Sequence, residues 1–296
     1  MLVASARLAP EPLRVGAPKV LDLRQTTNHP LSLRYSEIFS QCVLWGRFDH
    51  GRAQPGLNLA RSTPFVKAAQ AALAHGPDRA GVMDAMVRVL RRYYDRVRPA
   101  NAAAWLGLTG ADAPAALAAV PPWAAVFPWR ARSIESYREA FEQAALAENR
   151  SVGREVGIED GWLFCGPVSD EKVRIEAERI LFVLRCIIEH GYRRNDENDG
   201  DVRATALLNE AGDWRWLITA GNHRASAAAA LGLPAIPIRV NLVISRADVH
   251  HWRHVVDGLV TAAQALSVFD RYFDACPPPV AQPWLALSAN TLRRSL

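Results

Sequence analysis

Lysine is scarce in this chain of 296 residues: Lys19, Lys67 and Lys172 are the only lysines among 35 basic residues, so arginine carries most of the positive charge. The formal net charge is +5, but it is unevenly placed. Residues 1–158 carry a balance of +7 and residues 159–240 a balance of −3. A binding surface for nucleic acid needs its positive charge gathered on one face. The excess is instead spread over N-terminal arginines, and we do not expect nucleic acid as a partner.

Cysteine is also sparse, with four widely separated residues and no Cys-x-x-Cys pair. This spacing excludes a zinc ribbon and a thioredoxin-type redox site. Unpaired cysteines are typical of a reducing compartment. No metal site is predicted from them.

Long apolar runs are missing as well. The most apolar stretch, residues 115–129, is interrupted by three prolines and is too short to span a bilayer. Residues 1–13 lack the apolar core of a signal peptide. We therefore expect a cytoplasmic protein without a membrane span.

Hydrophobic periodicity predicts a mostly helical N-terminal domain over residues 1–158. Its first 60 residues are expected to be irregular with a few short strand-like pieces. Apolar residues at helical spacing then predict the following helices: 63–74, 78–96, 112–120 and 134–147. Ser62 or Thr63 is suited to cap the first of them, with Pro64 in its first turn.

The pattern changes after residue 158 and predicts an α/β (α+β) domain over 159–245. A long helix is expected from Ser169 to His190, ended by Gly191. The remaining expected elements are strands at 162–164, 202–208, 214–219 and 236–240 and a helix over 222–231. A helical C-terminal extension follows over 246–296, with helices expected at 246–257 and 262–273.

The most informative stretch is a strand that runs through a glycine directly into a helix. Free backbone N–H groups and the helix dipole make such a helix start an anion site. Gly221 allows a ligand to approach the backbone. Asn222, His223, Arg224 and Ser226 follow in the first turn, and Arg224 can bind phosphate through two donors. Neither a Walker loop nor a Gly-x-Gly-x-x-Gly dinucleotide loop stands at this junction.

The order of motifs resembles the ParB/sulfiredoxin superfamily. The sequence Gly-Asn-His-Arg at 221–224 precedes an alanine-rich helix, Leu231-Gly232 and Ile236-Pro237. The upstream helix, with Cys186 where serine is common in the family, also matches. The resemblance covers residues 163–242, and it implies a small mixed sheet with helices and a nucleotide-binding site at the glycine turn.

Members of this superfamily differ in chemistry. Sulfiredoxins use a cysteine inside the turn, where this chain has Asn222 or His223. ParB proteins bind CTP and carry a helix-turn-helix domain, which is not apparent after Val240. Gly-Asn-His-Arg is closest to the turn of the free-serine kinases, which use a carboxylate on or just before the first helix. The resemblance therefore favours a kinase.

Phosphoryl transfer needs a phosphate cradle, positive charge, usually Mg²⁺, and a group that accepts the hydroxyl proton. Glu171 and Glu176 are the candidate catalytic residues, as base or as metal ligand. Lys172 and Arg179 are candidate phosphate ligands on the same helix. The alternative interpretation is structural: Glu171 stabilises the helix start, and Glu176 with Arg179 forms a routine surface pair.

We therefore expect phosphate transfer from ATP or ADP, with CTP as another candidate nucleotide, to the hydroxyl of a small molecule. The alternative is a non-catalytic, nucleotide-gated adaptor that associates with DNA or protein, or a structural module that has lost activity. Two further clusters are expected to bind no metal. They are the histidines His250, His251 and His254, and the acidic residues Asp196, Glu197, Asp199 and Asp201.

Overall fold

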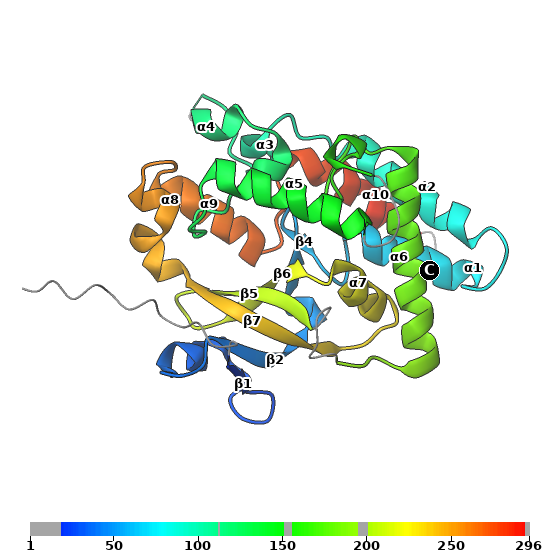
Figure 1. Ribbon diagram of the computed structural model, residues 1–296, viewed down its shortest axis with the longest axis horizontal. Helices are drawn as coiled ribbons and strands as arrows, with labels where there is room; N and C mark the ends of the chain where they lie inside the picture. The colour runs from blue at the N-terminus through cyan, green and yellow to red at the C-terminus, as the bar shows by residue number, and fades with distance from the viewer. Residues whose placement is uncertain (1–18, 112, 151–155, 195–200, 294–296) are drawn as a thin grey trace, which may run out of the picture.

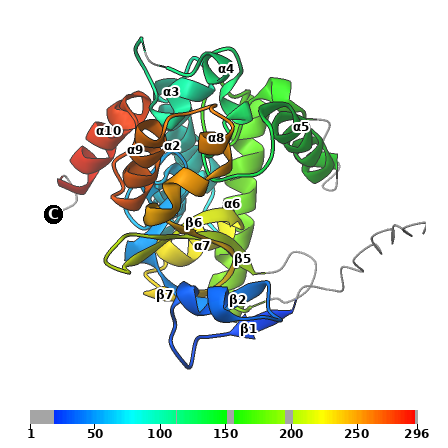
Figure 2. The same ribbon diagram turned by 90° about the vertical axis from the view of Figure 1, so that its left-hand side faces the viewer.

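A computed structural model describes residues 19–111, 113–150, 156–194 and 201–293 of the chain. The chain is a mixed α/β protein. In Figure 1 the strands lie in the lower half of the molecule and most helices lie above them. Figure 2 shows the same arrangement from the side, with β1 and β2 at the bottom and α3 and α4 at the top.

One mixed sheet of seven strands joins the beginning of the chain to its second half, in the order β1-β2-β7-β5-β6-β3-β4. The pairing of β2 with β7 and of β5 with β6 is antiparallel, whereas β5–β7, β1–β2 and β3–β6 are parallel. The strand-like pieces expected before residue 60 thus include four strands of this sheet. The strands are β1 (Val20–Asp22), β2 (Gln41–Arg47), β3 (Gly51–Ala53), β4 (Leu57–Asn58), β5 (Val202–Leu208), β6 (Trp214–Ala220) and β7 (Ala235–Ser245).

Local capping signals set the ends of the main helices. The Thr63 hydroxyl accepts a hydrogen bond from Val66 N at the start of α1, and the Ser169 hydroxyl accepts one from Lys172 N at the start of α6. Gly191 ends α6 with a positive φ, as predicted. The helices are α1 (Pro64–His75), α2 (Val82–Arg96), α3 (Ala102–Leu106), α4 (Ala115–Ala118), α5 (Ile134–Arg150), α6 (Asp170–His190), α7 (Asn222–Ala230), α8 (Arg253–Val256), α9 (Ala262–Phe273) and α10 (Gln282–Arg293).

Two local predictions were wrong. Trp162 forms only an isolated bridge to Cys165, so 162–164 is not a strand. The helix expected over 246–257 is divided, because Trp252 adopts extended backbone between the 3-10 helix Arg246–His251 and α8. His250 and His254 therefore do not share one helical face. The helix α10 lies within the helical extension expected over 246–296, although its own bounds were not predicted.

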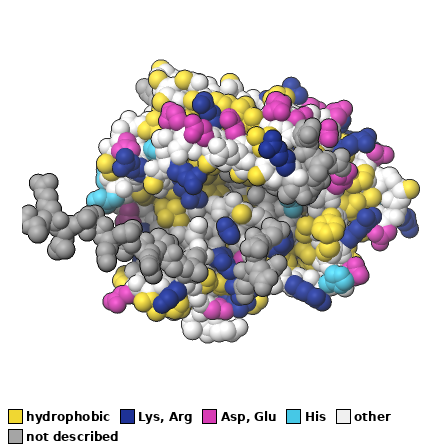
Figure 3. Space-filling model, viewed as in Figure 1, with side chains coloured by type: hydrophobic (Ala, Val, Ile, Leu, Met, Phe, Trp, Pro, Cys, Tyr) yellow, Lys and Arg dark blue, Asp and Glu magenta, His cyan; other side chains and the backbone are white. Residues whose placement is uncertain are grey.

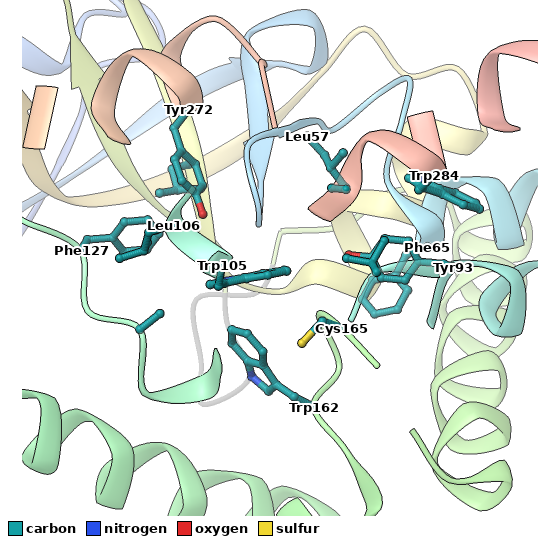
Figure 4. Close-up of a cluster of buried hydrophobic side chains, with 14 of the residues drawn as sticks. Leu57, Phe65, Tyr93, Trp105, Leu106, Phe127, Trp162, Cys165, Tyr272 and Trp284 are labelled. Carbon is teal, nitrogen blue, oxygen red and sulfur yellow. The ribbon is translucent and has the colours of Figure 1, made fainter. Parts of the chain in front are cut away.

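Two hydrophobic cores hold the layers together. The smaller core combines β2 residues such as Leu44 with β5, β7 and α7 residues. The larger core packs the helices on one another, and Figure 4 shows part of it, where Trp105 meets Trp162 edge-on at 5.1 Å between ring centres. Residues assigned to all three predicted domains contribute to the larger core. In the described part of the chain, no helix is both long and apolar enough to cross a bilayer.

Candidate functional site

The predicted glycine turn lies where β6 passes into α7. Gly221 has φ +84°, and a Cβ added there would lie 3.1 Å from Val202 Cγ2. Both observations favour glycine. The N-cap position of α7 is Gly221, which has no side chain to cap the first turn, and the leading backbone N–H groups of a helix are donors that suit an anion. In Figure 3 the face of the molecule is hollowed between α5 and the strands β5 and β7, and basic side chains lie in this hollow.

A buried carboxylate on α6 organises one side of the turn. The Glu176 side chain is 1% exposed, and its Oε1 accepts hydrogen bonds from Lys172 Nζ at 2.8 Å and from Arg179 at 3.3 Å. Its Oε2 lies 2.6 Å from Nε2 of His223, the second residue of α7. The structure thus brings together four of the predicted residues on one carboxylate, which joins α6 to the start of α7.

The charge on Glu176 is stabilised by its partners. Burial raises the pKa of this carboxyl group, but the charge and hydrogen bonds of His223 and Lys172 outweigh burial and lower the pKa to about 2. Glu176 is therefore ionised at neutral pH. A carboxylate with such a low pKa is a weak proton acceptor, so its geometry is that of a residue that positions cations.

The ring of His223 is fixed on two sides. Its Nε2 is bonded to Glu176, and its face stacks on Phe65 of α1 with 5.1 Å between ring centres and an interplanar angle of 30°. The side chain is 18% exposed, so the ring edge still reaches solvent. Phe65 was not predicted as a site residue, because nothing in its local sequence distinguishes it from the other apolar residues of its helix.

A second buried carboxylate lies on the sheet side of the turn. The Asp201 side chain is 1% exposed and accepts hydrogen bonds from Arg194 and from Arg239 of β7, each at distances near 3 Å. The Tyr192 hydroxyl senses both groups of charge: burial raises its pKa to about 12, Arg224 opposes the rise and Asp201 adds to it. Asp201 thus binds arginines, whereas Asp196, Glu197 and Asp199 lie outside the described residues.

The remaining predicted residues lie at the edges of this arrangement. Glu171 is exposed in the first turn of α6. Asn222 and the buried Ser226 line a small pocket at the start of α7. Thr63, Pro64 and Phe65 line the same pocket, so the first turns of α1 and α7 meet there.

The donor set does not fit a resident Mg²⁺ ion. Both oxygens of Glu176 and both oxygens of Asp201 accept hydrogen bonds from cationic side chains or His223. The described residues contain no group of three or more His, Cys, Asp or Glu side chains placed to hold a metal ion. The histidine cluster also fails as a ligand set, since His254 is buried whereas His250 and His251 are exposed.

Comparison with known proteins adds no relative. No family model, curated protein or solved structure matches this chain. The ParB/sulfiredoxin relationship therefore stays a prediction from the motifs at 163–242.

Proposed function

We propose that the protein binds the phosphate groups of a nucleotide at the start of α7 and transfers a phosphoryl group to the hydroxyl of a small molecule. ATP or ADP is the proposed donor. The observation that carries the proposal is the carboxylate of Glu176, which holds Lys172, Arg179 and His223 beside the uncapped first turn of α7. Helix N–H groups and fixed cations are the groups that bind phosphate.

Each part of the turn has a distinct task in this proposal. Gly221 brings the backbone to the phosphates without a Cβ in the way. Arg224 supplies charge from the side of Tyr192. Lys172 and Arg179 share the single carboxylate of Glu176, so these three side chains together retain net positive charge beside the turn. Preorganised positive charge stabilises the transferring phosphoryl group.

A Mg²⁺ ion would arrive with the nucleotide. Such an ion commonly keeps its own waters and is held chiefly by phosphate oxygens, and it would neutralise phosphate charge there. The protein residues bind and orient the phosphate groups. Glu176 acts on the reaction through the cations it positions.

A second candidate function is nucleotide binding without turnover, as in a nucleotide-gated adaptor for DNA or protein. The low pKa of Glu176 favours it, because the carboxylate does not suit the role of base. The exposed position of Glu171 favours it as well. The two functions share the binding site and differ in whether product forms.

Calorimetric titration with Mg²⁺ and ATP, ADP or CTP tests the binding site. We expect Arg224→Ala to weaken nucleotide affinity at least tenfold. Arg88→Ala, which removes an exposed arginine of α2, is the matched control and should leave affinity unchanged. Equal affinity in the wild type and Arg224→Ala would contradict the site assignment.

Phosphorus NMR with a panel of small hydroxyl compounds tests turnover. A new phosphate ester supports the kinase. Nucleotide binding with no product from any compound supports the adaptor, and a gel shift over a salt series then shows whether DNA is its partner, since phosphate contacts give a steep salt dependence.

A further inference from the structure

The hydrogen bond between His223 and Glu176 fixes which ring nitrogen is reactive. The carboxylate of Glu176 is an acceptor, so the proton of this 2.6 Å contact belongs to Nε2. In the neutral ring the lone pair then lies on Nδ1. Within the described residues, Nδ1 makes no hydrogen bond to a side chain or to the backbone. In this neutral form, His223 carries an oriented lone pair at the start of α7.

We propose that Nδ1 of His223 accepts the phosphoryl group from the nucleotide and passes it to the acceptor, so that transfer proceeds through a phosphohistidine. This inference rests on the proposed function and adds the path that the phosphoryl group takes. It assigns His223 a covalent role, whereas the sequence predicts only phosphate binding for this residue.

Two balanced steps make up the path. First, the Nδ1 lone pair attacks the terminal phosphorus of the nucleotide. The N–P bond forms, the bond from phosphorus to the bridging oxygen breaks, and the shortened nucleotide leaves with that electron pair. Second, the acceptor hydroxyl oxygen attacks the same phosphorus. The N–P bond breaks, its electron pair returns to Nδ1, and the hydroxyl proton passes to water.

The surroundings of His223 suit these steps. Phosphorylation at Nδ1 while Nε2 keeps its proton places positive charge on the ring, and the ionised carboxylate of Glu176 lies 2.6 Å away to balance it. Lys172 and Arg179, bound to the same carboxylate, add positive charge near the transferred group. The stack on Phe65 holds the ring plane during both steps. Such a path also needs no carboxylate base in its first step.

Labelling with [γ-³²P]ATP, or with [β-³²P]ADP, tests the inference without knowledge of the acceptor. Protein is incubated with Mg²⁺ and nucleotide, quenched in alkali and separated by gel electrophoresis. We expect label that is stable in alkali and lost in acid, together with isotope exchange between ATP and ADP in the absence of acceptor. Phosphorus NMR of the denatured protein identifies the N–P bond.

Two variants make the test specific. His223→Gln keeps a donor that can reach Glu176 but removes the nucleophile, and it should lose at least 95% of both label and exchange. Measurements of its unfolding temperature and of its nucleotide affinity by calorimetry show whether the variant is folded and binds nucleotide. His190→Ala is the matched control, because His190 lies 3.7 Å from Glu189 at the exposed end of α6. It should keep the wild-type label.

The outcomes separate this inference from the proposed function. Label on wild type and His190→Ala but not on His223→Gln supports the phosphohistidine. Nucleotide binding and product formation without label, or equal label on His223→Gln, overturns the phosphohistidine and leaves the kinase in place. Absence of any nucleotide binding overturns both.

Discussion

Replacement of Glu176 by glutamine should destabilise the fold at neutral pH and change how stability depends on pH. The folded-state pKa of Glu176 is about 2, against an ordinary value of 4.5. Because the folded-state pKa is the lower one, the carboxylate contributes its full stability above about pH 4.5. That contribution is lost as the pH falls from 4.5 toward 2.

The size of this contribution follows from the two pKa values. A tenfold change in an equilibrium constant corresponds to about 1.4 kcal/mol, so the fall from 4.5 to about 2 corresponds to about 3 kcal/mol. Glutamine carries no charge to balance Lys172, whose side chain is 7% exposed. Removing one partner of a buried pair costs about 3–5 kcal/mol. Both considerations give a loss of about 3 kcal/mol.

Urea unfolding followed by tryptophan fluorescence measures this effect at a series of pH values from 7 to 2.5. We expect the difference between wild type and Glu176→Gln to be largest at pH 7 and to shrink below pH 4.5. Glu171→Gln is the control, because Glu171 is exposed on the same helix, and it should change the free energy of unfolding by less than about 0.5 kcal/mol. A difference for Glu176→Gln that stays constant down to pH 2.5 would refute the reasoning.

Three further predictions concern neighbouring features. Asp201→Asn leaves two arginines without their carboxylate and should cost about 2 kcal/mol in urea unfolding; an unchanged midpoint would contradict it. Gly221→Ala forces alanine to φ +84° and should cost about 1–2 kcal/mol, and calorimetry should show weaker nucleotide binding. Iodoacetamide at pH 8 should label exposed Cys276 first, because burial raises the pKa of Cys42 to about 12; mass spectrometry shows the order.

Sequence signals were reliable where a structural feature is local. The helix α6 starts after Ser169 and ends before Gly191, as the pattern predicts. Gly221 lies between β6 and α7 with the positive φ that a tight junction requires. Each depends on a few adjacent residues, so their chemistry is readable in the chain.

The sheet could not be read in the same way. β2 pairs with β7, and β3 pairs with β6, so strands from the first 60 residues close onto strands that lie after residue 200. The sequence of a strand of only two or three residues, such as β3 or β4, does not indicate which strand it pairs with. These pairings depend on which apolar faces pack against one another in the two hydrophobic cores of the folded chain.

The candidate site also combines contacts that are local in the sequence with contacts between distant residues. Glu176 and Arg179 share one helical face because they are three residues apart on a helix, and the sequence predicts that pair. Lys172, four residues before Glu176, joins the same carboxylate in the structure. The contact of Glu176 with His223 spans 47 residues, and the stack of His223 on Phe65 joins α7 to α1. These contacts depend on the packing of three helices, which periodicity alone does not fix.

The burial of Glu176 shows that its contact with Arg179 is not a pair between two exposed side chains. A surface pair would leave both side chains in water, but Glu176 is 1% exposed while Arg179 and His223 retain 17% and 18% exposure. A buried ion pair adds little to stability over an apolar replacement, so stability alone gives little reason for a buried glutamate at this position. The arrangement does have one clear physical result. The negative charge is enclosed, whereas the Arg179 side chain and the His223 ring that it orients keep part of their surface exposed beside the start of α7.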